Sequence, residues 1–158
     1  MTTSSRFGKE ETATAAATAD GGGPDFARVL TLVERGVTSR FEEALKANGT
    51  TVEEWRILSL LGGDTGRAMT EIAEFAMLPA PTLTRVVDRM AAANLVYRRV
   101  DGSDRRRVLV IASAHGRQVL RRWDAAVERT WEELVTDIGS EEIALLRALL
   151  ARVAARLD

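Results

Sequence analysis

Arginine side chains gather in one stretch of this sequence, and their spacing points to phosphate-binding chemistry. Residues 101–110 read DGSDRRRVLV, which places Arg105, Arg106 and Arg107 between a turn signal and an alternating apolar run. Guanidinium groups form paired hydrogen bonds with phosphates and with the edge of guanine. Two interpretations of the cluster are open: a solvated loop whose arginines favour solubility, or a finger that touches nucleic acid.

The distribution of charge favours the second interpretation. The 158-residue chain has a formal net charge of −1, yet residues 79–107 hold seven arginines against three aspartates. That segment therefore carries +4 and the remainder −5. Basic charge confined to one segment of a nearly neutral chain indicates a binding face. Asp101 and Asp104 interrupt the cluster, which solubility alone does not require.

A second set of polar residues lies in residues 82–96, TLTRVVDRMAAANLV. Helical spacing puts four apolar residues on one face: Leu83, Val86, Val87 and Met90. A rotation of about 100° per residue leaves Thr82, Thr84, Arg85 and Arg89 toward the exposed side. Arg85 can pair with a guanine edge, Arg89 can reach a backbone phosphate, and the threonines can donate to phosphate or contact a thymine methyl. An ordinary solvated helix face is the alternative for both arginines.

Helical periodicity and turn residues predict the elements that would position these groups. We expect a disordered tail over residues 1–24, then a long amphipathic helix from Asp25 that Asn48 and Gly49 end. Thr51 begins a capping box in which the Glu54 side chain reaches back to the start of the second helix. Thr70 is the expected cap of a short third helix, and Asn94 is the expected left-handed end of the fourth.

The last third of the chain predicts a hairpin and two further helices. Residues 95–100 and 107–112 are β-prone runs around the turn DGSD. Ser113 should cap a long helix that reaches Gly139, and Ser140 should cap the last helix. That last helix should face inward through its apolar residues, which are Ile143, Leu146, Leu149, Leu150, Val153 and Leu157. The chain is thus expected to hold six helices and one two-stranded hairpin.

The order helix, helix, tight turn, helix, hairpin is that of a winged helix-turn-helix, and its details resemble the MarR family of bacterial transcriptional regulators. The resemblance covers about residues 25–158 and rests on EWRIL, on T-x-T-R-x-V-D-R-M and on D-R-R before the second strand. Pro79 and Pro81 depart from the family, which commonly has a serine cap and a polar residue at the entry of the recognition helix. Pro81 fits a first helical turn but removes a backbone donor.

The resemblance implies a mainly α fold: a winged helix-turn-helix domain, with three helices and a β-hairpin wing, flanked by long dimerisation helices. These would be residues 25–48 and 113–158, with the DNA-binding domain at 49–112. It further implies a homodimer on a palindromic operator in double-stranded DNA, often released by a small aromatic or anionic effector. Apolar helices at both ends of so short a chain are also best buried against a partner.

Roles for individual residues follow from the same resemblance. Arg106 matches the wing arginine that lies near the minor groove and is held by acidic neighbours, here Asp104 or Asp88 of the recognition helix. The family's ligand pocket would lie between the winged domain and the dimer helices, near Trp55. Trp55, Trp123 and Trp131 also fall on apolar stripes at helical spacing, where a role in the core is the usual explanation.

Composition argues against other classes of function. Without cysteine and with His115 as the one histidine, the chain offers no thiolate site, and we expect no metal and no cofactor. No constellation for catalysis stands out, so an enzyme is not expected. The sequence lacks the roughly 18-residue apolar run of a membrane span and a secretory signal, which predicts a cytoplasmic protein. The remaining alternative is a winged-helix protein-interaction module without DNA binding.

Overall fold

The computed structural model describes residues 23–63, 65–104 and 106–157, and the chain divides into two compact units between Val37 and Thr38. Most of the tail expected over residues 1–24 lies outside the described residues. Gly23 and Pro24, which were assigned to that tail, begin the first helix instead. Proline is compatible with a first helical turn because its missing N–H has no intrahelical partner there.

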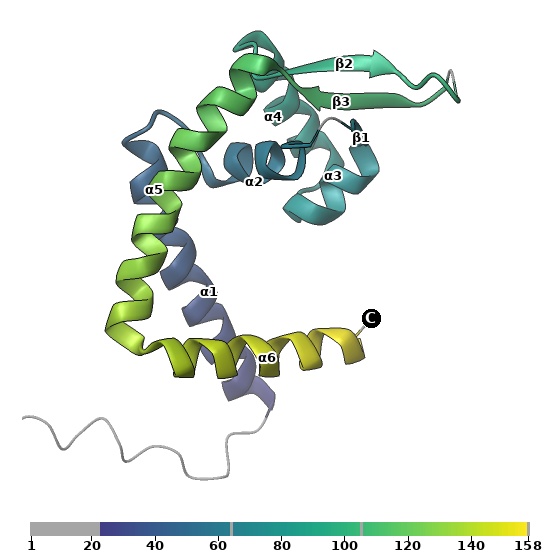
Figure 1. The fold of residues 1–158 in the computed structure, drawn as a ribbon. Helices are drawn as coiled ribbons and strands as arrows, with labels where there is room; N and C mark the ends of the chain where they lie inside the picture. The colour runs from purple at the N-terminus through teal and green to yellow at the C-terminus, as the bar shows by residue number, and fades with distance from the viewer. Residues whose placement is uncertain (1–22, 64, 105, 158) are drawn as a thin grey trace, which may run out of the picture. The chain divides into compact units, whose positions relative to one another are not determined.

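Within the described residues there are six helices and three strands. Their bounds are α1 (Gly23–Lys46), α2 (Val52–Leu60), β1 (Arg67–Ala68), α3 (Met69–Ala76), α4 (Ala80–Ala92), β2 (Val96–Val100), β3 (Val108–Ala112), α5 (Ala114–Ile138) and α6 (Ser140–Leu157). The expected mainly helical, winged helix-turn-helix class is confirmed. In Figure 1 the β2–β3 hairpin projects away from α2, α3 and α4.

The turn residues named from the sequence end the helices as expected. Gly49 follows α1 with φ of 72°, and Asn94 follows α4 with φ of 57°, both in the left-handed region. Thr51 is the N-cap of α2, since its side chain accepts from the Glu54 backbone N–H, and Ser113 caps α5 in the same way through Gly116. Only half of the expected capping box is present, because the Glu54 carboxylate bonds elsewhere.

Two expected caps are wrong. Helix α3 begins one residue before Thr70, and its N-cap is Ala68, held in an extended conformation by strand pairing. The backbone N–H of Ala68 donates at 3.4 Å to the Glu71 carboxylate, so a side chain three residues further along replaces the hydroxyl. Ser140 is the first residue of α6 rather than its cap.

The sheet contains a strand that the sequence did not predict. Strand β1 pairs antiparallel with β3, giving the order β1-β3-β2. Arg67 lies opposite Val110 and Ala68 opposite Leu109. Two residues are too few to show an alternating pattern, so only the pairing with β3 reveals this strand. The predicted hairpin is confirmed, with Val96 opposite Ala112 at its base and Val100 opposite Val108 toward its turn.

The core of the second unit holds α4 in place. The four apolar residues predicted for its inner face are all buried, with Val87 and Met90 fully covered. They belong to a cluster with Ile57 of α2, Leu61 just after α2, and Trp123 of α5. This packing fixes which face of α4 meets solvent.

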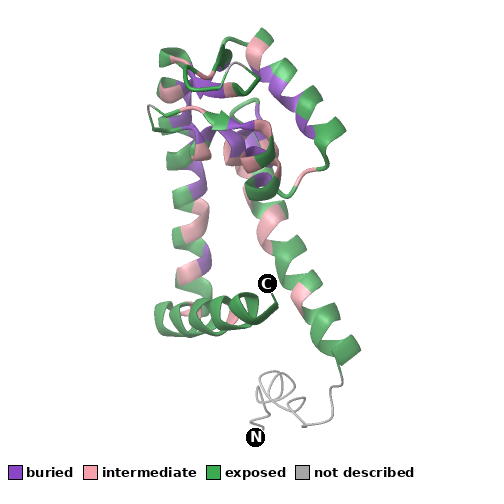
Figure 2. Ribbon diagram, turned by 90° about the vertical axis from the view of Figure 1, so that its right-hand side faces the viewer, coloured by how far each residue is buried: buried purple, intermediate pink, exposed green. Residues whose placement is uncertain are grey.

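The last helix is not covered by its own chain. None of its residues is buried (Figure 2), although the sequence predicted an inward apolar face. Leu146, Leu149 and Val153 are exposed, and Leu157 is 82% exposed. In the first unit, Phe26, Val29 and Leu32 of α1 are exposed as well. In the part of the chain that the structure describes, no helix is both long and apolar enough to cross a membrane.

Candidate nucleic-acid interface

The turn between α3 and α4 presents the N-terminal end of α4 without a side-chain cap. Met77 ends α3 in the left-handed conformation with φ of 54°, and the Leu78 N–H donates to the Ala73 carbonyl at 3.0 Å. Pro79 is the N-cap of α4, where no side-chain hydrogen bond is made, and Pro81 lies in the first turn as predicted. The local conformation is thus set by proline geometry rather than by a capping hydroxyl.

The outer face of α4 holds the polar residues expected there. Thr82, Thr84, Arg85, Asp88 and Arg89 are all exposed. The Thr84 hydroxyl donates to the Ala80 carbonyl at 2.9 Å, so its proton is engaged within the helix and its methyl group is left for an apolar contact. Arg85 is the long hydrogen-bond donor on this face that takes part in no ion pair among the described residues.

Arg89 has a partner that the sequence did not indicate. Its Nε donates at 2.8 Å to Oε1 of Glu54, whose side chain is only 10% exposed. The other carboxylate oxygen of Glu54 accepts from the Thr50 hydroxyl at 2.8 Å. The acid read as part of a capping box is instead a buried link between α2 and α4. Its position in the first turn of a helix marked Glu54 as a residue of interest in the sequence, but no neighbouring residue identified Arg89 as its partner.

The hairpin is tied to α4 through a different arginine from the one expected. Asp88 was one of two acids expected to hold Arg106, but its Oδ1 accepts from Arg98 of β2 at 2.6 Å. Arg98 and Arg99 are neighbours on a strand and point to opposite faces, so only one of them can turn toward α4. The expected link between α4 and the hairpin exists, but through the middle of β2 rather than through the hairpin tip.

A second ion pair ties the hairpin turn to α3. Arg107 donates at 2.6 Å to Oε1 of Glu71. The other oxygen of Glu71 accepts from the Ala68 N–H, so one carboxylate serves both the start of α3 and the hairpin. Glu71 was missed in the sequence because its partner stands 36 residues away.

Two aspartates shape the tip of the hairpin. Asp104 Oδ1 accepts from the backbone N–H of Arg106 at 2.9 Å, so it bends the chain rather than pairing with the Arg106 guanidinium. Asp101 accepts from both the backbone N–H and the hydroxyl of Ser103, and these bonds, with smaller contributions from Arg107 and Arg99, lower the pKa of its carboxyl. The Arg106 side chain is exposed. Arg105 lies outside the described residues.

Trp55 is held by two neighbours. Its indole Nε1 donates to Asp124 of α5 at 2.9 Å, and its ring meets Phe41 edge to face with centroids 6.0 Å apart. A cavity of about 420 Å³ opens beside Glu54 and Arg89, and Trp123 rather than Trp55 lines it.

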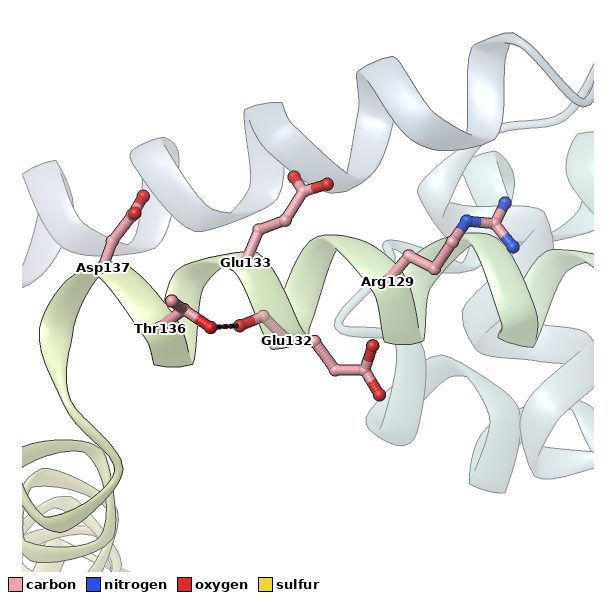
Figure 3. Close-up of a pocket in the computed structure, with 5 residues that line it drawn as sticks. All are labelled: Arg129, Glu132, Glu133, Thr136 and Asp137. Atoms are coloured by element: carbon pink, nitrogen blue, oxygen red, sulfur yellow. Dashed lines mark hydrogen bonds between the residues drawn. The ribbon is translucent and has the colours of Figure 1, made fainter.

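A second hollow, of about 430 Å³, lies along α5 (Figure 3). It is shaped by one helix, and its lining residues are Arg129, Glu132, Glu133, Thr136 and Asp137. The Thr136 hydroxyl donates to the Glu132 carbonyl, and Asp137 pairs with Arg40 at 3.6 Å. No group of three acidic or histidine side chains in the described residues is arranged to hold a metal ion.

Comparison with known proteins places this geometry in context. Residues 48–107 match the model of the MarR family. Over 125 residues the chain is 26% identical to the HTH-type transcriptional regulator FarR of Neisseria gonorrhoeae, covering 79% of this chain and 86% of that one.

Two solved structures share the fold. The transcriptional repressor CouR, bound to a 23-mer DNA duplex, superposes with a TM-score of 0.75 at 24% identity, covering 87% of this chain and 99% of that one. NadR in complex with 4-hydroxyphenylacetate gives a TM-score of 0.70 at 24% identity, covering 98% of each chain.

Proposed function

We propose that the chain is a winged-helix transcriptional regulator of the MarR family, a sequence-specific DNA-binding repressor that occupies a palindromic operator as a homodimer. The observation that carries this proposal is the outer face of α4. Its threonines and Arg85 are exposed, while its apolar residues are locked in the core. A helix presented in this way, after a tight turn and before a hairpin, suits insertion into the major groove.

Arg85 is the proposed reader of sequence. Its guanidinium can donate two hydrogen bonds to one guanine, while Thr82 and the methyl group of Thr84 lie on the same exposed face of α4. Asp88 is occupied by Arg98, which lowers the repulsion that a lone carboxylate on this face would exert on phosphates.

The hairpin is the proposed wing. Arg106 would enter the minor groove, whose negative potential attracts arginine. Arg105 is assigned to the same contact from its place in the sequence. Arg107 would contribute through the pair with Glu71, which holds the hairpin against α3. The two ion pairs favour a wing that meets DNA in one orientation.

The proposed dimer uses residues 25–48 and 113–158. The exposed apolar residues of α1 and α6 support it, because contiguous apolar faces of this kind mark interaction surfaces. A two-fold dimer would set two copies of α4 about 34 Å apart, one turn of B-DNA, over the two halves of a palindrome. As a regulator of this kind the protein is assigned to the cytoplasm.

A small aromatic or anionic effector is proposed to release the DNA. The 4-hydroxyphenylacetate complex of the structurally similar NadR supports a ligand of this class. Trp55, placed between α2 and α5 by its bond to Asp124, is the candidate contact. A ligand can act only through different affinities for the DNA-bound and free arrangements.

Selection from randomised duplexes at two salt concentrations, read by fluorescence anisotropy and by sequencing of the bound fraction, tests the proposal. A palindromic motif with affinity that falls steeply with salt is the expected result. Absence of enrichment with weak binding at both salts would favour the alternative, a winged-helix protein-interaction module. Sedimentation at micromolar concentration tests the dimer, and a stable monomer would contradict it.

A further inference from the structure

Arg89 stands on the helix that reads DNA, and its charge and length suit a phosphate contact. In the structure, its Nε instead donates a hydrogen bond to Oε1 of Glu54 at 2.8 Å. We propose that Arg89 is a positioning residue: its pair with Glu54 fixes the C-terminal end of α4 on α2 and thereby sets where Arg85 meets the DNA. This inference rests on the proposed DNA-binding function.

Burial of the acid is the first argument. The Glu54 side chain is 10% exposed, whereas that of Arg89 is 56% exposed. A buried carboxylate without a cation is costly, so Glu54 holds Arg89 more firmly than an exposed acid would. Its two oxygens have separate partners, Arg89 and the Thr50 hydroxyl, and no buried side-chain polar atom among the described residues lacks a hydrogen bond. Transfer of Arg89 to a phosphate would remove one of these partners.

The helix ends supply the second argument. Glu54 lies in the first turn of α2, where the partial positive charge of the helix terminus favours an anion, and Arg89 lies in the last turn of α4, where a cation is favoured. The pair therefore joins two helix ends of opposite polarity. It ties α4 at the end opposite to its first turn, one turn beyond Arg85, so its loss permits rotation or sliding of the reading face.

The cavity beside the pair supplies the third argument. This space of about 420 Å³ is lined by Glu54 and Arg89 together with Thr50, Leu95 and Trp123. The ion pair lies at the edge of this space and adds a polar link between α2 and α4 to the core packing of Val87 and Met90.

The test compares Arg89→Gln with the double variant Glu54→Gln, Arg89→Gln by anisotropy on the selected operator and on a random duplex. A positioning role predicts that Arg89→Gln lowers operator affinity about 2- to 30-fold, the range of mutations that act through packing networks. The double variant should return to within about threefold of wild type, because its two neutral amides can hydrogen-bond to each other between α2 and α4 and no unpaired buried charge is left. Random-duplex affinity and the dependence on salt should stay as in wild type.

A phosphate contact predicts the opposite pattern. The double variant would then bind as weakly as Arg89→Gln, on both duplexes, and the slope of log affinity against log salt would fall by about 0.9 per arginine, or about 1.8 per dimer. That result overturns the inference. If Arg89→Gln does not fold by circular dichroism, the double variant alone decides through the same slope and affinity.

Arg56→Gln is the matched control, since it removes an arginine of α2 that lies outside α4, the hairpin and the proposed dimer helices. It should leave operator affinity unchanged. Failure of wild type to bind any duplex would contradict the proposed function itself. Operator binding by wild type without recovery in the double variant would contradict only the role of Arg89.

Discussion

Gly116 in the first turn of α5 allows the closest approach between this helix and the hairpin. A Cβ built there would lie 2.1 Å from the backbone oxygen of Leu95 and 3.3 Å from Cδ1 of Leu58. An ordinary carbon–oxygen contact is about 3.3 Å or longer, so the helix would have to move by about 1.2 Å. The obstacle is a carbonyl that already accepts the Ser113 N–H at 2.9 Å, so it cannot turn aside without loss of that bond.

Gly116→Ala should therefore destabilise the protein. Overpacking of this kind costs up to about 3 kcal/mol, and the higher helix propensity of alanine returns about 1 kcal/mol. The net loss of about 2 kcal/mol corresponds to a fall in Tm of about 4–8 °C for a chain of this size. Urea unfolding followed by tryptophan fluorescence, at fixed protein concentration, measures the free energy of unfolding directly.

Gly36→Ala in α1 is the matched control, because no atom lies within 4 Å of its Cβ position. It should stabilise the protein by up to about 1 kcal/mol through helix propensity alone. The two substitutions thus differ in sign although both replace a helical glycine. A Gly116→Ala protein that unfolds at or above the wild-type urea midpoint would refute the close approach of α5 to Leu95.

Four further substitutions test the reading surface and its supports. Arg85→Ala should cost about 1–3 kcal/mol of operator binding and relax preference at one base pair in each half-site, while equal losses on random DNA would make it a phosphate contact. Arg106→Ala should weaken binding to all sequences and lower the salt slope by about 0.9 per arginine in the same titrations, so an unchanged affinity would contradict the wing assignment. Met77→Gly should raise the free energy of unfolding by about 1 kcal/mol, because Met77 is 86% exposed and adopts a left-handed conformation, and a loss of stability would show that its side chain packs. Ser103→Ala should raise the pKa of Asp101 toward its usual value in an NMR titration, because the hydroxyl bond that helps to lower it is lost. In wild type, the stabilisation from the lowered pKa is present above the usual pKa of an aspartate. It is lost as the pH falls through the pKa of Asp101 in the folded state.

The predictions that succeeded rest on information held within a few residues. Gly49, Asn94 and Ser113 mark helix ends through their own backbone and side-chain chemistry, and the structure uses each of them in that way. The inner face of α4 follows from helical spacing alone, because one rotation places all four apolar residues together. The hairpin follows from alternation around a turn.

The errors concern groups whose partners are distant in sequence. Arg98 and Asp88 are 10 residues apart, Arg89 and Glu54 are 35 apart, and each partner is one of several acids that the sequence offers. The start of α3 was misplaced for the same reason. Ala68 is held extended by β3, 41 positions later at Leu109, and this pairing overrides the preference of Thr70 for a cap.

The ion pairs of the hairpin also reduce the positive charge that the arginine cluster presents to DNA. Exposed ion pairs contribute at most about 1 kcal/mol to stability, so Arg98 with Asp88 and Arg107 with Glu71 act mainly by holding orientation. Each of these carboxylates also offsets one positive charge. The charge of +4 counted over residues 79–107 includes Asp88 but not Glu71, and Arg89 is compensated in turn by Glu54. Counterion release on binding should therefore follow the arginines of this segment outside the three pairs, Arg85 and Arg106 among them. A salt slope set by all seven arginines would mean that DNA breaks the three pairs.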